Sequence, residues 1–157
     1  MKDQNYLKSY NTILLVEDDQ NDVLLVKRAF KKANNVNNIQ VVNDGEAAIA
    51  YLDGDGEYQD RNKYPLPIMI LLDLKLPKKS GHEVLAWRQG KPVVRRIPVV
   101  VLSSSNRSED VNRAYDLGAN SYLNKPMSFD DLVTMVKELN MYWQILNLPP
   151  HLEIQNK

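Results

Sequence analysis

Residues 67–77 read PIMILLDLKLP, an apolar run that ends on a single carboxylate, Asp73. Residues 97–103 (IPVVVLS) end in the same way on a hydroxyl, and residues 12–19 (TILLVEDD) end on three carboxylates. Apolar runs that do not alternate with polar residues indicate strands covered on both faces, as in parallel sheets. These three stretches therefore predict the centre of an α/β domain.

Segments with helical spacing separate these strands along the chain. We expect helices over residues 22–32, 46–52, 83–89, 109–117 and 128–146, and weaker strands over residues 39–42 and 121–123. Five strand–helix pairs in regular alternation are typical of a doubly wound, flavodoxin-like α/β fold with helices on both faces. The sequence therefore predicts a five-stranded parallel sheet in the order 2-1-3-4-5.

The 157 residues suffice for one hydrophobic core. We expect a single domain over residues 12–146, an N-terminal extension over residues 1–11 and a C-terminal tail over residues 147–157. Residues 53–65 (DGDGEYQDRNKYP) are polar and rich in turn formers, which predicts a loop inserted before the third strand.

The composition excludes several classes of function. Lys and Arg together number 20, as do Asp and Glu, so the net charge of zero argues against direct binding to nucleic acid. The absence of cysteine excludes disulfides and thiolate metal sites. No apolar run approaches the ~20 residues that span a membrane, and the N-terminus is unlike a signal peptide. We therefore expect a soluble, cytoplasmic protein.

Polar side chains follow the predicted strands at their carboxyl ends, where ligands bind in doubly wound sheets. Glu17, Asp18 and Asp73 would form a carboxylate cluster that repels itself unless a cation is present, and hard oxygen ligands suit Mg²⁺. Ser103 and Lys125 add a hydroxyl and a positive charge. This set matches the needs of a phosphoryl group: charge neutralisation, a hydrogen-bond donor and a carboxylate nucleophile.

Each of these residues also has a plain structural interpretation. Asp18 and Asp19 could cap a helix, a serine after a strand is commonly a turn residue, and Lys125-Pro126 could be an ordinary loop. The coincidence of such groups at four strand ends favours a site.

Four motifs occur in register with the strand–helix pairs. They are Val16-Glu17-Asp18-Asp19, Leu72-Asp73-Leu74-Lys75-Leu76-Pro77 with Gly81, Val101-Leu102-Ser103, and Lys125-Pro126. Together they resemble the receiver domain of bacterial two-component response regulators, the CheY-like fold. The resemblance covers residues 12–146.

The resemblance implies a phosphorylation site. Asp73 would accept a phosphoryl group from a sensor histidine kinase. Glu17, Asp18 and Asp73 would hold Mg²⁺ together with the backbone carbonyl of Lys75. Lys75 would also shield the acyl phosphate from water and so slow its hydrolysis.

The resemblance also implies a switch around the phosphorylation site. Lys125 would pair with Asp73 and then with the phosphoryl oxygens. Ser103 would be the switch hydroxyl, and Tyr122 the aromatic residue that moves with it. Ser105, two positions after Ser103, would tune dephosphorylation, and the Lys125–Pro126 bond would be cis.

By this resemblance the chain is a single-domain response regulator that acts on an unknown downstream protein and takes part only in its own phosphoryl transfer, without being an enzyme. The loop over residues 53–65 and the ending over residues 141–150 look like those of receivers partnered with cyanobacterial phytochromes.

Two alternatives for the function remain open. One is a pseudo-receiver that binds partners without phosphorylation. The other is a haloacid-dehalogenase-type enzyme, although such enzymes carry a second Asp where this chain has Lys75.

The predicted last helix has a second apolar edge, formed by Met135, Tyr142 and Ile145. Exposed apolar patches often mark contacts between subunits. We therefore expect a homodimer through the last helices and the tail.

Overall fold

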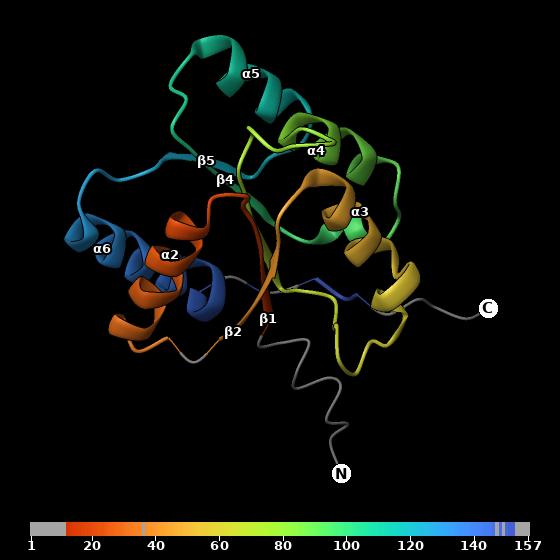
Figure 1. Ribbon diagram of the computed structural model, residues 1–157, viewed down its shortest axis with the longest axis horizontal. Coiled ribbons are helices and arrows are strands. Elements are labelled where there is room, and N and C mark those ends of the chain that lie inside the picture. The colour runs from red at the N-terminus through yellow and green to blue at the C-terminus, as the bar shows by residue number, and fades with distance from the viewer. Residues whose placement is uncertain (1–11, 36, 147, 149, 153–157) are drawn as a thin grey trace.

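The computed structural model describes residues 12–35, 37–146, 148 and 150–152. Five parallel strands form one sheet in the order β2-β1-β3-β4-β5, which confirms the predicted fold class and strand order (Figure 1). The strands are β1 (Thr12–Val16), β2 (Asn38–Val42), β3 (Met69–Leu72), β4 (Val99–Ser103) and β5 (Ser121–Asn124).

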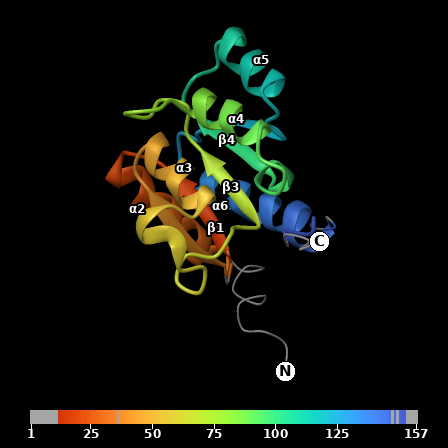
Figure 2. The same ribbon diagram turned by 90° about the vertical axis from the view of Figure 1, so that its right-hand side faces the viewer.

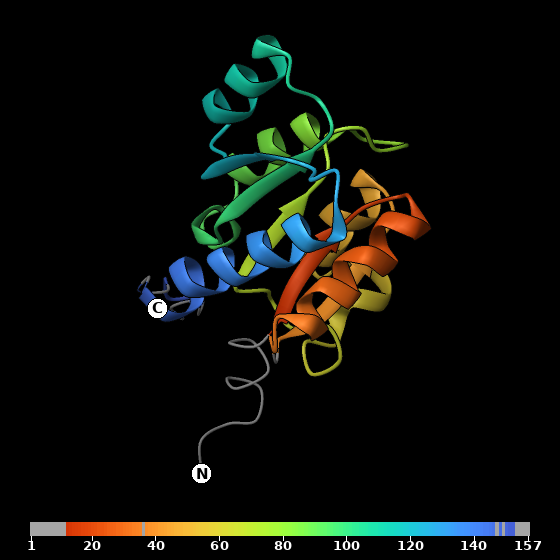
Figure 3. The same ribbon diagram turned by 90° about the vertical axis from the view of Figure 1, so that its left-hand side faces the viewer.

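The helices cover both faces of the sheet. They are α2 (Gln20–Lys32), α3 (Gly45–Asp53), α4 (Gly81–Gln89), α5 (Ser108–Asp116) and α6 (Phe129–Leu139). α2 and α6 pack side by side on one face through apolar residues such as Phe30 and Val136 (Figure 3). α3, α4 and α5 cover the other face with residues such as Leu52, Leu85 and Ala114 (Figure 2). The sheet therefore separates two apolar clusters.

Burial explains which strands had strong sequence signals. Every residue of the three central strands β1, β3 and β4 is buried, since helices cover them on both sides. The edge strands β2 and β5 are mostly half-exposed, so their sequences are less apolar. The predicted runs at residues 67–72 and 97–102 begin two residues early, because their prolines precede the strands.

The end of the last helix differs from the expectation of one regular α-helix to residue 146. α6 ends at Leu139, and the chain continues in π-helical geometry as η3 (Asn140–Leu146). The apolar spacing of three and four residues does not distinguish the two geometries over so short a segment. At the junction, the Asn140 side chain accepts a hydrogen bond from Asn35 at 3.2 Å.

The loop predicted over residues 53–65 contains a short 3-10 turn, η1 (Gly56–Gln59), and folds against the end of α3. The rings of Tyr51, Tyr58 and Tyr64 pack together, with centroids 5.0 to 5.9 Å apart. The Arg61 guanidinium donates to the carbonyls of Tyr51 at 2.7 Å and Leu52 at 2.9 Å. The loop therefore satisfies the last carbonyls of α3, at the amino edge of the sheet.

The predicted extension over residues 1–11 lies outside the described residues, as does the tail apart from residues 148 and 150–152. Leu152 packs against the apolar cluster beneath α3 and α4, and the His151 carbonyl accepts a hydrogen bond from Arg96, in the short turn η2 (Val94–Arg96), at 3.2 Å. Within the described part of the chain, no helix has the length and apolar character needed to cross a membrane.

Candidate functional site

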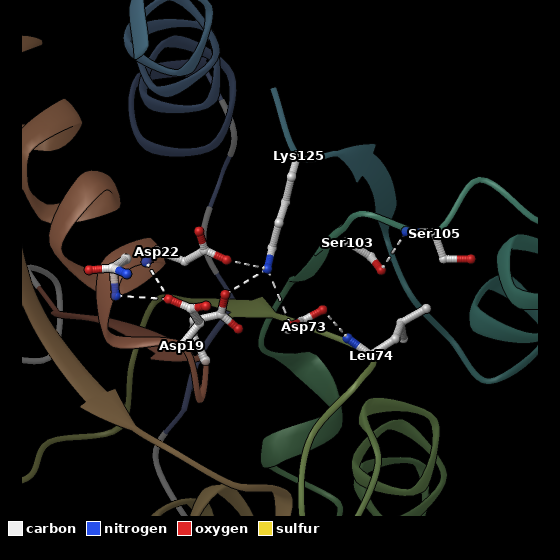
Figure 4. Close-up of polar contacts among 9 residues, drawn as sticks. Asp19, Asp22, Asp73, Leu74, Ser103, Ser105 and Lys125 are labelled. Carbon is white, nitrogen blue, oxygen red and sulfur yellow. Dashed lines mark hydrogen bonds and ion pairs between the residues drawn. The ribbon is translucent and has the colours of Figure 1, made fainter. Parts of the chain in front are cut away.

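The Lys125 ammonium lies among three carboxylates at the carboxyl edge of the sheet (Figure 4). Its Nζ donates to Glu17 Oε1 at 2.6 Å, to Asp22 Oδ2 at 2.9 Å and to Asp73 Oδ2 at 3.3 Å. Glu17 and Asp73 are buried, whereas Lys125 and Asp22 are half-buried. The Lys125 ammonium therefore connects the ends of β1 and β3 with the start of α2.

Strand register brings these residues together. Val16 of β1 pairs with Leu72 of β3, so Glu17 and Asp73, the next residue of each strand, are neighbours. The Asp73 N–H donates to the Val16 carbonyl at 3.1 Å. On the other side, the Lys125 N–H donates to the Ser103 carbonyl at 2.9 Å. The parallel ladder thus continues one residue beyond the strands and positions each polar side chain.

A glycine allows the loop after Asp73 to lie close to α4. A Cβ atom added to Gly81 would lie 2.4 Å from the Asp73 carbonyl oxygen and 2.7 Å from the Leu74 Cα. The Gly81 N–H donates to the Leu74 carbonyl at 2.9 Å. The position of Asp73 therefore depends on the absence of a side chain at residue 81.

Three of the predicted residues form a group that suits a metal ion. Glu17, Asp18 and Asp73 each offer a carboxylate oxygen, and these oxygens lie within 4.8 Å of one another. Glu17 Oε2 is buried and has no hydrogen-bond partner in the described structure. An orphaned buried oxygen beside two other carboxylates fits a hard divalent cation such as Mg²⁺ or Mn²⁺.

Burial and charge change the protonation of the cluster. Burial and the nearby carboxylates of Asp73 and Asp22 raise the pKa of Glu17 to about 9, although the hydrogen bond from Lys125 opposes the shift. Burial by itself would lower the pKa of Lys125, but the hydrogen bonds to Glu17 and Asp22 and the charge of Asp73 raise it well above its ordinary value. In the absence of a divalent metal ion, Glu17 therefore favours the protonated form, while the Lys125 ammonium stays charged.

The predicted switch residues are linked through the loop after β4. Ser103 is fully buried, and its Oγ accepts a hydrogen bond from the Ser105 N–H at 3.2 Å. The Tyr122 hydroxyl donates to the Ser105 carbonyl at 2.8 Å, and the Ser105 hydroxyl donates to Asp110 Oδ2 at 2.6 Å. Among the described residues no hydrogen bond joins Ser103 to Asp73, so the two form separate groups in this state.

The structure gives the neighbouring carboxylates Asp18 and Asp19 different surroundings. Asp19 is the N-cap of α2 and accepts hydrogen bonds from the N–H groups of Asn21 at 2.8 Å and Asp22 at 3.1 Å. Asp18 is exposed and belongs to the carboxylate cluster. The capping interpretation is thus right for Asp19 and wrong for Asp18.

Sequence reasoning missed Asp22, which binds Lys125 from the first turn of α2. The available signal was its position one helical turn after Asp18, on a helix that starts at the carboxyl edge.

The expected cis bond between Lys125 and Pro126 was wrong, because the described peptide bonds are all trans. The trans form is the more stable one for a bond before proline, by about 0.5–1 kcal/mol.

The site thus combines a buried carboxylate, an acidic group that could hold a metal ion, a lysine and a nearby hydroxyl at one edge of a doubly wound sheet. These are the features of a phosphoryl-accepting switch domain. The model of the response regulator receiver domain family matches residues 13–137. The chain belongs to this family, whose members act in two-component signalling through phosphorylation.

Three relatives illustrate this membership. The chain is 44% identical over 141 residues to "Probable methanogenesis regulatory protein FilR2" of Methanothrix harundinacea, covering 88% of this chain and 86% of that protein. It is 43% identical over 138 residues to response regulator Rcp1 of Synechocystis, covering 87% and 92%. Among solved structures, the phosphorylated cyanobacterial phytochrome response regulator RcpA has a TM-score of 0.83 at 39% identity, covering 90% and 99%.

A structure of the Mn²⁺-bound form of Rcp1 is also similar, with a TM-score of 0.80, 41% identity and coverage of 90% and 99%. Receiver domains bind Mg²⁺ or Mn²⁺ at an acidic site, and this chain has such an acidic cluster. The relatives named here are regulatory proteins, which agrees with the receiver assignment.

Proposed function

We propose that Asp73 accepts a phosphoryl group from the phosphohistidine of a sensor kinase and that this modification changes the affinity of the protein for a partner. The observation that carries the proposal is the placement of Asp73, beside Lys125 and within the Glu17–Asp18 acidic group, in a chain of the receiver family. A pseudo-receiver is less consistent with this complete set of polar groups.

In the transfer step, a carboxylate oxygen of Asp73 attacks phosphorus and forms a P–O bond. The P–N bond to the kinase histidine breaks, and its electron pair returns to the imidazole, which takes up a proton. Lys125 offsets the charge of the phosphoryl oxygens. The Ser103 hydroxyl, whose oxygen accepts from the Ser105 N–H in this state, then donates its own hydrogen to a phosphoryl oxygen. Tyr122 moves with this loop because its hydroxyl donates a hydrogen bond to the Ser105 carbonyl.

Glu17, Asp18 and Asp73 would hold Mg²⁺, with the Lys75 carbonyl as a fourth protein ligand. When bound, Mg²⁺ supplies positive charge opposite the phosphoryl oxygens. The Lys75 side chain is exposed beside the site and would slow hydrolysis of the acyl phosphate by keeping water away. The protein thereby takes part in its own modification without turnover of a free substrate.

The partners are proposed by analogy with relatives. RcpA is by its name a phytochrome response regulator, so we infer that a phytochrome-type histidine kinase, acting in the cytoplasm, is the phosphoryl donor.

Met141 and Tyr142 are exposed on η3 and support a homodimer through the last helices and the tail. Ile145, part of the predicted apolar edge, has a side chain outside the described structure. We also propose residues 12–146 as the receiver domain.

The test is phosphorylation by acetyl phosphate with Mg²⁺, resolved on a phosphate-affinity gel. We expect a shifted band for the parent and for Asp130→Asn, a carboxylate exposed on α6, and none for Asp73→Asn. A parent protein that does not shift, or a shift that persists in Asp73→Asn, would overturn the proposal. Sustained turnover of small phosphate esters would instead indicate an enzyme.

A further inference from the structure

Lys125 has one carboxylate partner, Asp22, that does not belong to the group that could hold a metal ion. We propose that Asp22 is a positioning residue, which holds the Lys125 ammonium in place for phosphoryl transfer once the acidic group is loaded with a cation. This inference rests on the proposed function, because it concerns the same reaction at Asp73.

The geometry gives each hydrogen of the ammonium one partner. A lysine has three N–H donors, and Lys125 uses them on Glu17, Asp22 and Asp73. The contacts with Glu17 and Asp22, at 2.6 and 2.9 Å, are short charge-assisted hydrogen bonds, whereas Asp73 lies at 3.3 Å. The position of Nζ is therefore determined by Glu17 and Asp22 more than by the acceptor itself.

These three partners would not contribute equally to the orientation of the Lys125 ammonium once a divalent cation is bound. The carboxylates of Glu17 and Asp73 would each be shared between Lys125 and a divalent cation, and their hydrogen bonds to Lys125 would weaken because the cation draws on the same negative charge. Asp22 lies outside that group and stays free to bind Lys125 alone. Its share in orienting the ammonium is therefore largest in the state that reacts.

The two residues also differ in how firmly the fold holds them. Asp22 lies in the first turn of α2, its N–H is bonded to the cap residue Asp19, and the next residue, Val23, is buried in the apolar cluster under the helix. Lys125 follows β5, the edge strand, and its long side chain has more conformational freedom. A carboxylate on a packed helix thus fixes a flexible cation.

The expected consequence is kinetic. Removal of one charge-assisted hydrogen bond should leave Lys125 in several orientations and slow phosphorylation of Asp73 by about tenfold. The affinity for Mg²⁺ should stay within about twofold of the parent, because Asp22 is no member of the metal-binding group. A residue that acts through the metal would instead change both quantities together.

The experiment compares Asp22→Asn, Asp22→Glu and the matched control Asp130→Asn, which removes a carboxylate from the first turn of α6 without a contact to Lys125. Phosphorylation rates are measured with acetyl phosphate at saturating Mg²⁺, and the Mg²⁺ dissociation constant by calorimetry. We expect the slow rate for Asp22→Asn alone, partial recovery in Asp22→Glu and a parental rate in the control. Asp22→Ser, which suits a helix start, replaces Asp22→Asn should that variant fold poorly.

A second background tests whether Asp22 acts through Lys125. In Lys125→Met, the further change Asp22→Asn should leave the residual rate unchanged. The coupling between the two residues should also appear in the free energy of unfolding, measured in urea with Mg²⁺ present. The loss of stability in the double variant should differ from the sum of the losses in the two single variants, whether or not the protein is phosphorylated. An equal slowing in both backgrounds, a parental rate for Asp22→Asn or a matching loss of Mg²⁺ affinity would overturn the inference. A parent that is not phosphorylated would overturn the proposed function as well.

Discussion

The Ser105 hydroxyl donates a hydrogen bond of 2.6 Å to Oδ2 of Asp110, and so connects the loop after β4 to the first turn of α5. The same serine offers its carbonyl to the Tyr122 hydroxyl and its N–H to Ser103. Ser105 is therefore the residue through which the predicted switch hydroxyl, the predicted switch aromatic and α5 are connected in this state.

Substitution of Ser105 by alanine should change the titration of Asp110. The hydrogen bond from Ser105 is the main cause that holds the pKa of Asp110 below its ordinary value, with a smaller contribution from the charge of Arg107. Ser105→Ala should raise this pKa toward the ordinary range, as measured by NMR titration of the side-chain carboxyl. Because a lowered carboxyl pKa stabilises the fold at pH above its unfolded value, the variant should lose less stability than the parent on acidification.

The control for this prediction is Ser104→Ala, since Ser104 is exposed on the same loop. It should leave the titration of Asp110 as in the parent. An unchanged pKa of Asp110 in Ser105→Ala would show that the hydroxyl does not carry the interaction.

Neutralisation of Glu17 should stabilise the protein that is free of metal. Burial beside Asp73 and Asp22 raises the pKa of Glu17 to about 9, so the fold favours its protonated form. The stabilising contribution of this proton is present below the ordinary pKa of 4.5 and is lost as the pH rises toward 9. At pH 8 without divalent cations, Glu17→Gln should therefore melt about 2–4 °C higher than the parent in calorimetry.

Addition of Mg²⁺ should reverse this order. The parent gains stability from a ligand that binds only the folded state, whereas Glu17→Gln gains less because it has lost one carboxylate of the group. Glu46→Gln, an exposed residue of α3, should behave as the parent in both conditions. The same melting temperature with and without Mg²⁺ in the parent would contradict the assignment of a metal site.

The fold was predictable from the sequence because the three central strands are apolar throughout and each ends on a polar residue. The carboxylate cluster followed from the same pattern, since parallel strands place their carboxyl ends at one edge. The contact of Asp22 with Lys125 joins residues 103 positions apart and depends on how α2 packs, which no local pattern encodes. Likewise, Asp19 caps α2 because the helix begins at Gln20, and no local pattern fixes that starting residue.

A methyl group at residue 81 should displace the acceptor loop. In Gly81→Ala the new Cβ would meet the backbone of Asp73 and Leu74 at 2.4 and 2.7 Å, which backbone atoms can relieve only by moving. We expect a loss of about 1–3 kcal/mol in urea unfolding and slower phosphorylation at Asp73. Gly90→Ala is the matched control, because its Cβ would have its nearest neighbour at 3.6 Å. Equal stability of the two variants would contradict the close approach at Gly81.

Removal of the Arg61 side chain should loosen the inserted loop without changing the chemistry at the opposite edge of the sheet. Arg61 binds the carbonyls of Tyr51 and Leu52 at the end of α3. Arg61→Ala removes both hydrogen bonds and leaves the Tyr51 carbonyl with the Gly54 N–H alone. Limited proteolysis should then cut within residues 53–65 at least severalfold faster than in the parent or in Arg95→Ala, which removes an exposed guanidinium of η2. Phosphorylation by acetyl phosphate should proceed at the parental rate, because the loop lies at the amino edge and Asp73 at the carboxyl edge. Slower phosphorylation in Arg61→Ala would show that the loop and the acceptor site are coupled through α3.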